Sequence, residues 1–198
     1  MRTEILLYDG FDELDAVGPY EVLSGARFDT AFVTLDGAER ITGSHGAELV
    51  PHARIGDSPA LLVIPGGGWS GRSRRGAWAE AERGAVPAAI AERHAAGSTI
   101  AAVCTGGMLV ARAGLLEGRP AVTHHSALDD LAAAGADVKR DARVVDDGDI
   151  LTAGGVTSGI DLALWLVERE HGTELADRVA AEIEHTRSSH IWRAGAPA

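Results

Sequence analysis

The only cysteine of the 198-residue chain, Cys104, stands where an apolar strand is expected to give way to a helix. Residues 99–103 are typical of a buried strand, and residues 108–113 form a helical run. Gly106 and Gly107 lie between them and permit a tight turn. Because a helix N-terminus stabilises a thiolate and lowers its pKa, this position favours a nucleophilic Cys104. The alternative is a buried, inert thiol, since free cysteine is often a small core residue.

Three side chains are candidates to exchange a proton with this thiol. Asp15 begins a helix predicted over residues 15–23, and that helix follows the first strand. Its carboxyl group is therefore expected at the same sheet edge as Cys104, although a helix-capping role is the alternative. His124 and His125 are candidates because a Cys–His pair is the usual way to activate a thiolate. Two ordinary solvent-facing histidines would explain the same pair.

Glycine-rich loops end three apolar strands, at residues 65–68, 104–107 and 154–155. In an open α/β sheet, ligands bind outside the carboxyl ends of the strands, so these loops predict the place of the active site. The backbone N–H groups of Gly66 and Gly67 would suit an anion-stabilising hole beside the thiol, with a purely structural turn as the alternative. The glycine patterns of phosphate and dinucleotide sites are missing, which disfavours phosphate binding.

Aromatic and basic residues give weaker signals. The four tryptophans are candidates for pocket walls, although large aromatic side chains usually lie in cores or interfaces. They are Trp69, Trp78, Trp165 and Trp192. One basic cluster, Arg72, Arg74 and Arg75, lies in a Gly/Ser-rich stretch and is most simply a solvated loop.

Short apolar runs alternate with longer helical ones, which is the pattern of an α/β sheet with crossover helices. The predicted strands cover residues 4–8, 30–35, 60–64, 99–103, 120–123, 142–145 and 150–153, with a hairpin over 41–51. The predicted helices cover residues 15–23, 86–96, 108–113, 126–134, with Ser126 as N-cap, 158–170 and 174–185. We expect one domain over residues 1–187, followed by a loose C-terminal tail over residues 188–198.

Composition narrows the classes of function. One cysteine permits no internal disulfide, and the N-terminus lacks the pattern of a signal peptide, so a cytoplasmic protein is expected. No apolar run approaches the length of a membrane span. The net charge of -11 opposes binding to nucleic acid or to anionic lipid. The histidines and carboxylates show no metal-ligand spacing such as H-E-x-x-H, so we expect neither a metal nor an organic cofactor.

Six ordered stretches of the sequence resemble the ThiJ/PfpI superfamily, a class I glutamine amidotransferase-like group, and within it the isonitrile hydratases. They are Leu14-Asp15-Ala16-Val17-Gly18-Pro19 with Glu21-Val22-Leu23, Ile64-Pro65-Gly66-Gly67, Val103-Cys104-Thr105-Gly106, Ala113-Gly114-Leu115-Leu116, Thr123-His124, and Gly154-Gly155-Val156-Thr157-Ser158-Gly159-Ile160-Asp161. The resemblance covers nearly the whole chain.

The resemblance implies a flavodoxin-like, three-layer α/β/α sandwich with a mainly parallel sheet, a nucleophile elbow and assembly as a homodimer. Cys104 matches the family nucleophile, and Asp15 matches the acidic residue that faces it. Thr105 matches the threonine that follows the nucleophile in isonitrile hydratases, and Gly66 and Gly67 match the glycine pair that lines the anion pocket. With Gly106, His124 and Trp69, these residues make up the expected site.

Several branches of the superfamily fit less well. Protease-like members carry His directly after the cysteine, where this chain has Thr105, and the late His-x-Glu signature of glutamine amidotransferases has no counterpart. A related group of transcription regulators adds a helix-turn-helix module, and we expect no DNA-binding half in this acidic chain. Two departures from isonitrile hydratases concern the substrate: Gly68-Trp69 with the basic loop after it, and His125 where those enzymes commonly have Trp.

The sequence therefore predicts an enzyme that adds water to a small-molecule isonitrile through a cysteine thioimidate and releases an N-substituted formamide. Two alternatives stay open. The same Cys–carboxyl pair could support glyoxalase or deglycase-like chemistry on reactive carbonyls. A low-pKa thiol could instead serve as a non-catalytic redox sensor.

Overall fold

The computed structural model describes residues 1–195 of the chain, and its centre is an eight-stranded sheet. In spatial order the strands are β12 (Ile191–Arg193), β10 (Val144–Asp146), β11 (Ile150–Ala153), β7 (Thr99–Ala102), β6 (Leu61–Ile64), β1 (Arg2–Leu6), β2 (Asp29–Thr34) and β5 (Ala53–Arg54). Neighbouring strands run parallel except β10 and β11, which are antiparallel. Two small ladders lie outside this sheet: β3 (Ile41–Thr42) with β4 (Glu48–Leu49), and β8 (Pro120–Ala121) with β9 (Asp137–Val138).

The central strands β6 and β7 are the most apolar part of the sheet. Every residue of β6 is buried, as expected for a parallel strand covered by helices on both faces. The two strands pair in register, with Ile64 opposite Ala102. Their carboxyl ends therefore lie side by side, and the loops that begin at Pro65 and Cys104 leave the sheet next to each other.

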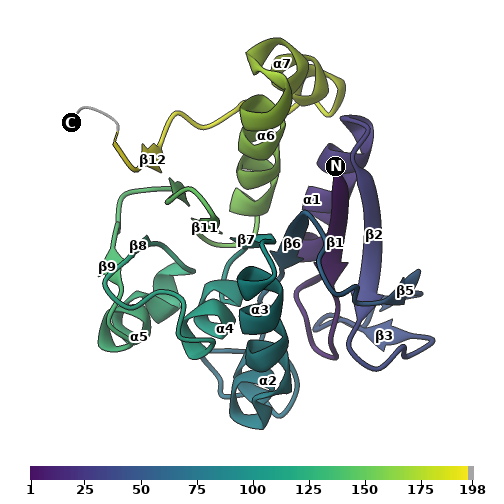
Figure 1. Ribbon diagram of the computed structural model, residues 1–198, viewed down its shortest axis with the longest axis vertical. Helices are drawn as coiled ribbons and strands as arrows, with labels where there is room; N and C mark the ends of the chain where they lie inside the picture. The colour runs from purple at the N-terminus through teal and green to yellow at the C-terminus, as the bar shows by residue number, and fades with distance from the viewer. Residues whose placement is uncertain (196–198) are drawn as a thin grey trace.

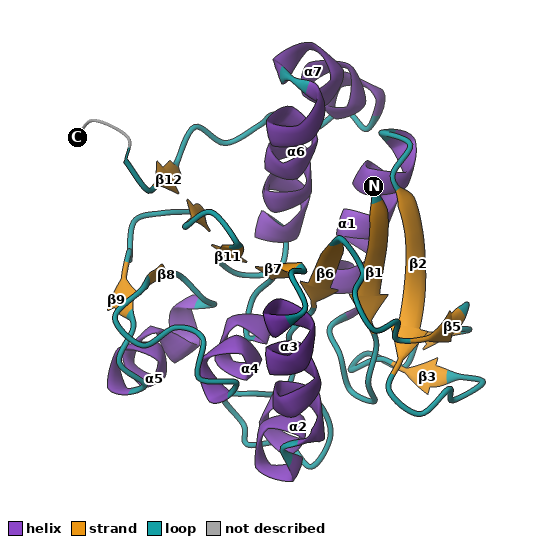
Figure 2. Ribbon diagram, in the orientation of Figure 1, coloured by secondary structure: helices purple, strands orange, loops and turns teal. Residues whose placement is uncertain are grey.

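Helices cover both faces of the sheet (Figures 1 and 2). They are α1 (Glu13–Gly25), α2 (Ala77–Arg83), α3 (Ala85–Ala95), α4 (Gly106–Arg112), α5 (Leu128–Ala133), α6 (Ser158–His171) and α7 (Thr173–Glu182), with a 3₁₀ turn η1 (His125–Ala127) before α5. Helix α6 packs against α1 and α7, whereas α2, α3 and α4 pack against one another. This three-layer arrangement confirms the fold class predicted from the sequence.

Two helices differ from the sequence prediction in instructive ways. Helix α1 begins at Glu13 rather than at residue 15, because the Asp12 side chain accepts a hydrogen bond from the Leu14 N–H at 3.2 Å and caps the helix. Helix α2 was not predicted, since its sequence is short and lies between the basic loop and α3. Asp15 is therefore a first-turn residue and not the cap.

The buried apolar residues form one connected core. Its largest fully buried side chains lie on β1, β6, β7, α1, α3 and α4 and in neighbouring loops, and they include Ile5, Leu6, Phe11, Ile64, Ile100 and Leu109. Within residues 1–195, no helix has the length and apolar character needed to cross a membrane.

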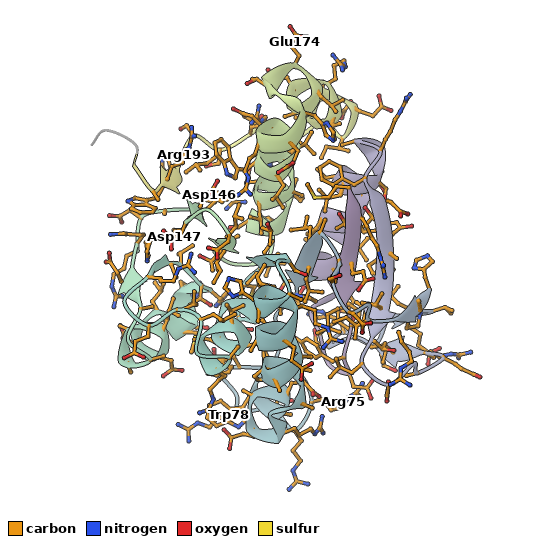
Figure 3. All side chains as sticks on the ribbon, viewed as in Figure 1. Arg75, Trp78, Asp146, Asp147, Glu174 and Arg193 are labelled. Atoms are coloured by element: carbon orange, nitrogen blue, oxygen red, sulfur yellow. The ribbon has the colours of Figure 1, made fainter. Side chains whose placement is uncertain are left out.

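The segment after Ser188 differs from the expected loose tail. Ile191–Arg193 forms β12, which pairs with β10 and places Arg193 opposite Asp146 (Figure 3). The Arg143 N–H donates to the His190 carbonyl at 2.8 Å. A sheet edge offers unpaired backbone groups, and this segment satisfies those of β10. The prediction of a loose tail is therefore wrong for residues 191–193, and residues 196–198 lie outside the described part of the chain.

Candidate active site

Cys104 occupies a strained turn between β7 and α4. Its φ angle is 56°, in the left-handed region that non-glycine residues rarely adopt. Its N–H donates to the carbonyls of Ala153 (3.1 Å) and Gly154 (2.9 Å), which fixes the turn against the end of β11. A Cβ atom at Gly106 would overlap the Ile64 carbonyl oxygen, so the turn requires glycine there. The thiol thus lies on a tight strand–turn–helix elbow, and only 5% of the residue is exposed.

Asp15 faces this thiol from the first turn of α1. Its side chain is fully buried, and its Oδ2 accepts a hydrogen bond from the Gly66 N–H at 2.9 Å. Its Oδ1 is buried and has no partner among the described residues. Burial, and secondarily the negative charge of Asp12, raise the pKa of Asp15 to about 8, although hydrogen bonds from Gly66 and from the Cys104 thiol oppose the rise. Asp15 is therefore a protonated carboxyl group at neutral pH.

The same burial corrects the prediction of a thiolate with a low pKa. Burial and the negative charge of an ionised Asp15 raise the pKa of Cys104 to about 12, although backbone hydrogen bonds from Val156 and Thr105 oppose the rise. Helix α4 begins two residues after Cys104 and has only seven residues, so its dipole offsets little of the cost of burial. Both groups therefore hold their protons at neutral pH.

Gly66 and Gly67 place other groups instead of forming the expected anion hole with their N–H groups. The Gly66 N–H is taken by Asp15, and the Gly67 N–H donates to Thr105 Oγ1 at 2.9 Å. A Cβ atom at Gly66 would lie 2.5 Å from the Thr105 nitrogen, so this close approach requires glycine. The prediction of a free pair of donors is therefore wrong: the two amides join the loop after β6 to Asp15 and to Thr105.

The backbone donors that favour a thiolate come from Val156 and Thr105. Val156 follows the third glycine-rich loop and has a φ angle of 30°, also in the left-handed region. The sequence placed that loop at the site but gave no signal for Val156 itself. Tyr8 is a second residue that sequence reasoning missed. Its hydroxyl donates to the Pro65 carbonyl at 2.5 Å, and burial with the charges of Asp15 and Cys104 raises its pKa well above the usual value.

His124 and His125 lie near the site without joining the thiol. Their rings lie 4.1 Å apart, and His124 Nδ1 pairs with Ser126 Oγ at 2.7 Å. Burial, together with the neighbouring His125, lowers the pKa of His124, so its ring is neutral at pH 7. The His124 ring packs against Gly155, where a Cβ atom would lie 2.6 Å from it. Ser126 falls within η1, whose N-cap is His124, whereas α5 has Ala127 as its N-cap and no side-chain cap, so the prediction of Ser126 as N-cap is wrong.

Trp69 is a buried structural residue. Only 5% of it is exposed, and its Nε1 donates to Asp130 Oδ2 at 2.7 Å. Its ring meets Trp78 edge to face at 5.1 Å. These contacts fasten the loop after Gly68 to α5, and a direct contact of Trp69 with substrate stays a prediction.

An open groove lies beside Val156, and Cys104 is not among the residues that line it. It is lined by Asp12, Glu13, Leu14, His45, Ala47 and Val156. Burial alone would raise the pKa of Glu13, but hydrogen bonds from the His45 side chain and from backbone N–H groups outweigh it and lower the pKa to about 2. The Glu13 carboxylate accepts from the N–H groups of His45 (2.8 Å) and Ala47 (3.2 Å), and so holds the loop between β3 and β4 over the groove.

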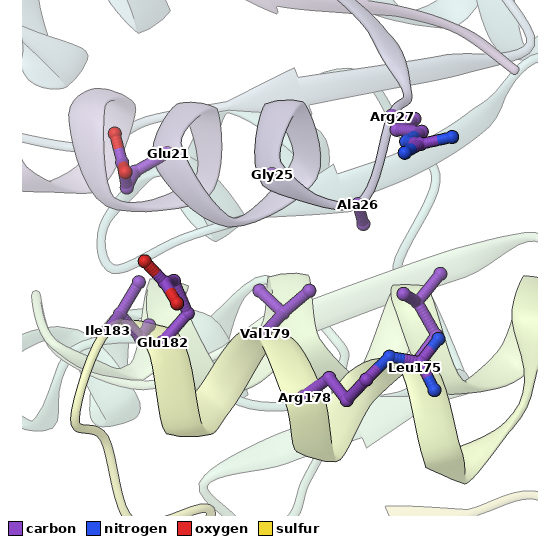
Figure 4. Close-up of a pocket in the computed structure, with 9 residues that line it drawn as sticks. All are labelled: Glu21, Gly25, Ala26, Arg27, Leu175, Arg178, Val179, Glu182 and Ile183. Carbon is purple, nitrogen blue, oxygen red and sulfur yellow. The ribbon is translucent and has the colours of Figure 1, made fainter.

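Ligand atoms of Asp12, Glu13 and His45 lie within 4.8 Å of one another, the one such group among residues 1–195 that could hold a metal ion. A second groove lies between α1 and α7 (Figure 4) and is lined by Glu21, Gly25, Ala26, Arg27, Leu175, Arg178, Val179, Glu182 and Ile183. It opens at the end of α1 opposite to Asp15, about 15 Å along the helix axis. We therefore place the candidate site at the elbow.

Comparisons with known proteins agree with the fold described above. The model of the DJ-1/PfpI family matches residues 1–169. The chain is 34% identical to an isonitrile hydratase of Pseudomonas putida over 93% of its length and 78% of the relative, and 27% identical to the Parkinson disease protein 7 homolog of Danio rerio over 92% and 96%. A ThiJ/PfpI family protein from Pseudomonas syringae has a similar structure, with a TM-score of 0.82, 29% identity and coverage of 94% and 76%. On this sequence match and this shared fold, the chain belongs to the DJ-1/PfpI family.

Proposed function

We propose that this protein is an isonitrile hydratase, which converts an isonitrile and water into an N-substituted formamide. The observation that carries the proposal is the buried Asp15 carboxyl beside the Cys104 thiol, with a pKa raised to about 8. An isonitrile carbon must accept both a nucleophile and a proton. A thiol next to a protonated carboxyl group supplies both at neutral pH.

The first step forms a thioimidate. The Cys104 sulfur bonds to the isonitrile carbon while the Asp15 carboxyl delivers its proton to the same carbon. The thiol proton passes to Asp15, so the acid is restored and R–N≡C becomes R–N=CH–S–Cys104. The backbone N–H groups of Val156 and Thr105 favour negative charge on the sulfur as its proton leaves.

The second step releases the product. Asp15 gives its proton to the thioimidate nitrogen and takes one from the attacking water, which adds to the carbon as a hydroxyl group. The tetrahedral adduct R–NH–CH(OH)–S–Cys104 then expels the sulfur: Asp15 gives its proton to the sulfur and takes the hydroxyl proton, and R–NH–CHO leaves. Thr105 supports both steps through its hydrogen bond with Gly67, because the adjoining Gly66 N–H holds Asp15.

The groove beside Val156 suggests the class of substrate. Leu14, Ala47 and Val156 give it an apolar wall, and Leu14 is 39% exposed. The carboxylates of Asp12 and Glu13 lie at the same groove, and the chain carries a net charge of -11. We therefore propose that neutral isonitriles with an apolar substituent bind there in preference to anionic ones.

The test incubates the purified protein with cyclohexyl isonitrile and follows formamide formation. The matched variants are Cys104→Ser, Asp15→Asn and, as a control on the same helix, Glu21→Gln. Turnover by wild type and Glu21→Gln but not by the two site variants supports the proposal. Absence of turnover across several alkyl isonitriles contradicts the proposed function. Turnover that survives in both site variants shows that the roles assigned to Cys104 and Asp15 are wrong.

One alternative has an observation in its favour. The chain is 27% identical to the Parkinson disease protein 7 homolog over nearly its whole length, and the Cys–carboxyl pair could also act on reactive carbonyls. A methylglyoxal assay on the same variants separates this activity from hydration. The redox-sensor alternative is less favoured, because oxidation proceeds through the thiolate and burial raises the pKa of Cys104.

Assembly as a homodimer and a cytoplasmic location remain proposals. Leu14 and Val17, on the outer face of α1, are 39% and 40% exposed, which supports burial of this face against a second copy. Sedimentation of wild type and of a Val17→Asp variant measures the oligomeric state. The proposal expects a dimeric wild type and a monomeric variant, and a wild type that is a monomer at micromolar concentration contradicts it.

A further inference from the structure

Val156 holds a conformation that its side chain disfavours. Its φ angle of 30° lies in the left-handed region, where a β-branched residue is an outlier. Its loop is nevertheless tied to the turn at Cys104, whose N–H donates to the Gly154 carbonyl at 2.9 Å, and the Val156 backbone favours the thiolate. Such a conformation persists only where neighbouring contacts enforce it. The residues that make those contacts determine where the donor points.

Arg143, directly before β10, bonds to the chain on both sides of Val156. Its carbonyl accepts a hydrogen bond from the Gly154 N–H at 3.0 Å, two residues before Val156. Its Nη2 donates to the Thr157 hydroxyl at 2.9 Å, one residue after Val156. The same residue thus fixes both flanks of the strained position.

Thr157 is the N-cap residue of α6, but its side chain does not cap the helix. An N-cap threonine ordinarily accepts a hydrogen bond from an N–H group of the first helical turn, which stabilises the helix. Here the hydroxyl accepts from Arg143 instead. The Thr157 hydroxyl therefore makes a contact that restrains the loop beside Cys104 and does not cap α6.

Asp161 holds the Arg143 guanidinium in place. Only 3% of Asp161 is exposed, and its Oδ2 pairs with Arg143 Nε. Its Oδ1 accepts from His185 Nε2 at 3.0 Å and from the Ser188 N–H at 2.9 Å. Both oxygens are satisfied, so the carboxylate has one favourable arrangement and so does the arginine.

We propose that Arg143 and Thr157 are positioning residues that hold the Val156 N–H against the Cys104 sulfur. The inference rests on the proposed function for the role of Cys104 as the reacting group, but not for the identity of the substrate. Loss of the Arg143–Thr157 contact lets the loop relax away from the sulfur. The thiolate then loses a donor, and the pKa of Cys104 rises.

The test measures the rate of Cys104 alkylation by iodoacetamide between pH 6 and pH 9. The chain has one cysteine, so the reaction reports on a single site. Thr157→Val removes the hydroxyl and keeps the shape, whereas Thr157→Ser keeps the hydroxyl. Thr173→Val, at the exposed start of α7, is the matched control.

We expect Thr157→Val to alkylate about fourfold more slowly than wild type. A rise of one pKa unit lowers the thiolate fraction tenfold, and the greater nucleophilicity of a more basic thiolate offsets part of that loss. Thr157→Ser and Thr173→Val should match wild type. Equal rates for Thr157→Val and wild type, with circular dichroism showing both folded, overturn the inference.

A second variant decides the matter if Thr157→Val does not fold. Arg143→Lys keeps the positive charge facing Asp161 but lacks the guanidinium group that bonds Asp161 and Thr157 together. It should therefore alkylate more slowly than wild type, as Thr157→Val does. A wild-type rate in this variant overturns the inference equally. Because alkylation requires no isonitrile, a wild type without hydratase activity would refute the proposed function and leave this result readable.

Discussion

Replacing Asp15 with asparagine should stabilise the folded chain while it abolishes the reaction. The buried carboxyl has a pKa of about 8 in the folded protein, against about 3.9 for an aspartate in an unfolded chain. Between these values the unfolded state has released a proton that the folded state keeps. Unfolding therefore becomes more favourable as pH rises through this window, and the full cost is present above about pH 8.

The size of the effect follows from the width of the window. From about pH 5 to about pH 8 the free energy of unfolding of wild type should fall by about 3 to 4 kcal/mol because of this one group, at about 1.4 kcal/mol per pH unit. Asparagine cannot titrate, so its variant should show no such fall. At pH 7 the variant gains less than the full amount, because an amide group without a partner at the Oδ1 position costs about 1 to 3 kcal/mol.

Urea unfolding at several pH values measures this difference. Wild type and Asp15→Asn are compared with Asp29→Asn, an exposed aspartate at the start of β2 that serves as the control. The free energy of Asp15→Asn minus that of wild type should grow with pH, while the control difference stays flat. A difference for Asp15→Asn that does not change between pH 5 and pH 8 refutes the raised pKa and, with it, the acid role of Asp15.

Three further substitutions test other parts of the site. Gly66→Ala should lower the free energy of unfolding by about 1 to 3 kcal/mol and abolish turnover, since the new methyl group collides with the Thr105 backbone; urea unfolding and the isonitrile assay check both. Val156→Gly should raise the free energy of unfolding by about 1 kcal/mol, because it removes left-handed strain at some cost in chain entropy; an unchanged or lower melting temperature contradicts this. Glu13→Ala should free the loop after β3 and raise KM for cyclohexyl isonitrile with little change in kcat. Steady-state kinetics, with Glu21→Ala as the control, measure both constants, and a lower kcat at an unchanged KM contradicts the prediction.

The sheet and the elbow could be predicted because their signals are local. Buried runs such as Leu61–Ile64 and Thr99–Ala102 are continuous and end at glycine-rich loops, and parallel strands place those loops at one edge. Helix α2 and strand β12 carried no such signal. Ile191–Arg193 is short, and it is a strand because it pairs with β10 rather than because of its own sequence.

The sequence could predict which residues belong to the site but not which hydrogen bonds they make. The sequence placed Asp15, Cys104 and Gly66 at one sheet edge, and in the structure Asp15 accepts a hydrogen bond from the Gly66 N–H and lies against the Cys104 thiol. It did not reveal the depth of burial, which reverses the expected direction of the Cys104 pKa shift. Nor could it assign individual N–H groups: the backbone donor expected from Gly66 is supplied by Val156. Burial and hydrogen-bond direction depend on contacts between residues far apart in the chain.

The contact between the loops after β6 and β7 has a consequence for how this site can change. Gly66 and Gly106 bring main chain against main chain there, and a side chain at either position would collide with it. The spacing between acid and nucleophile is therefore set by the peptide backbone and is largely insensitive to neighbouring side-chain substitutions. The groove beside Val156 has no such restriction, since no glycine is among the residues that line it. Selection can therefore alter which molecules are admitted while the reacting pair keeps its geometry.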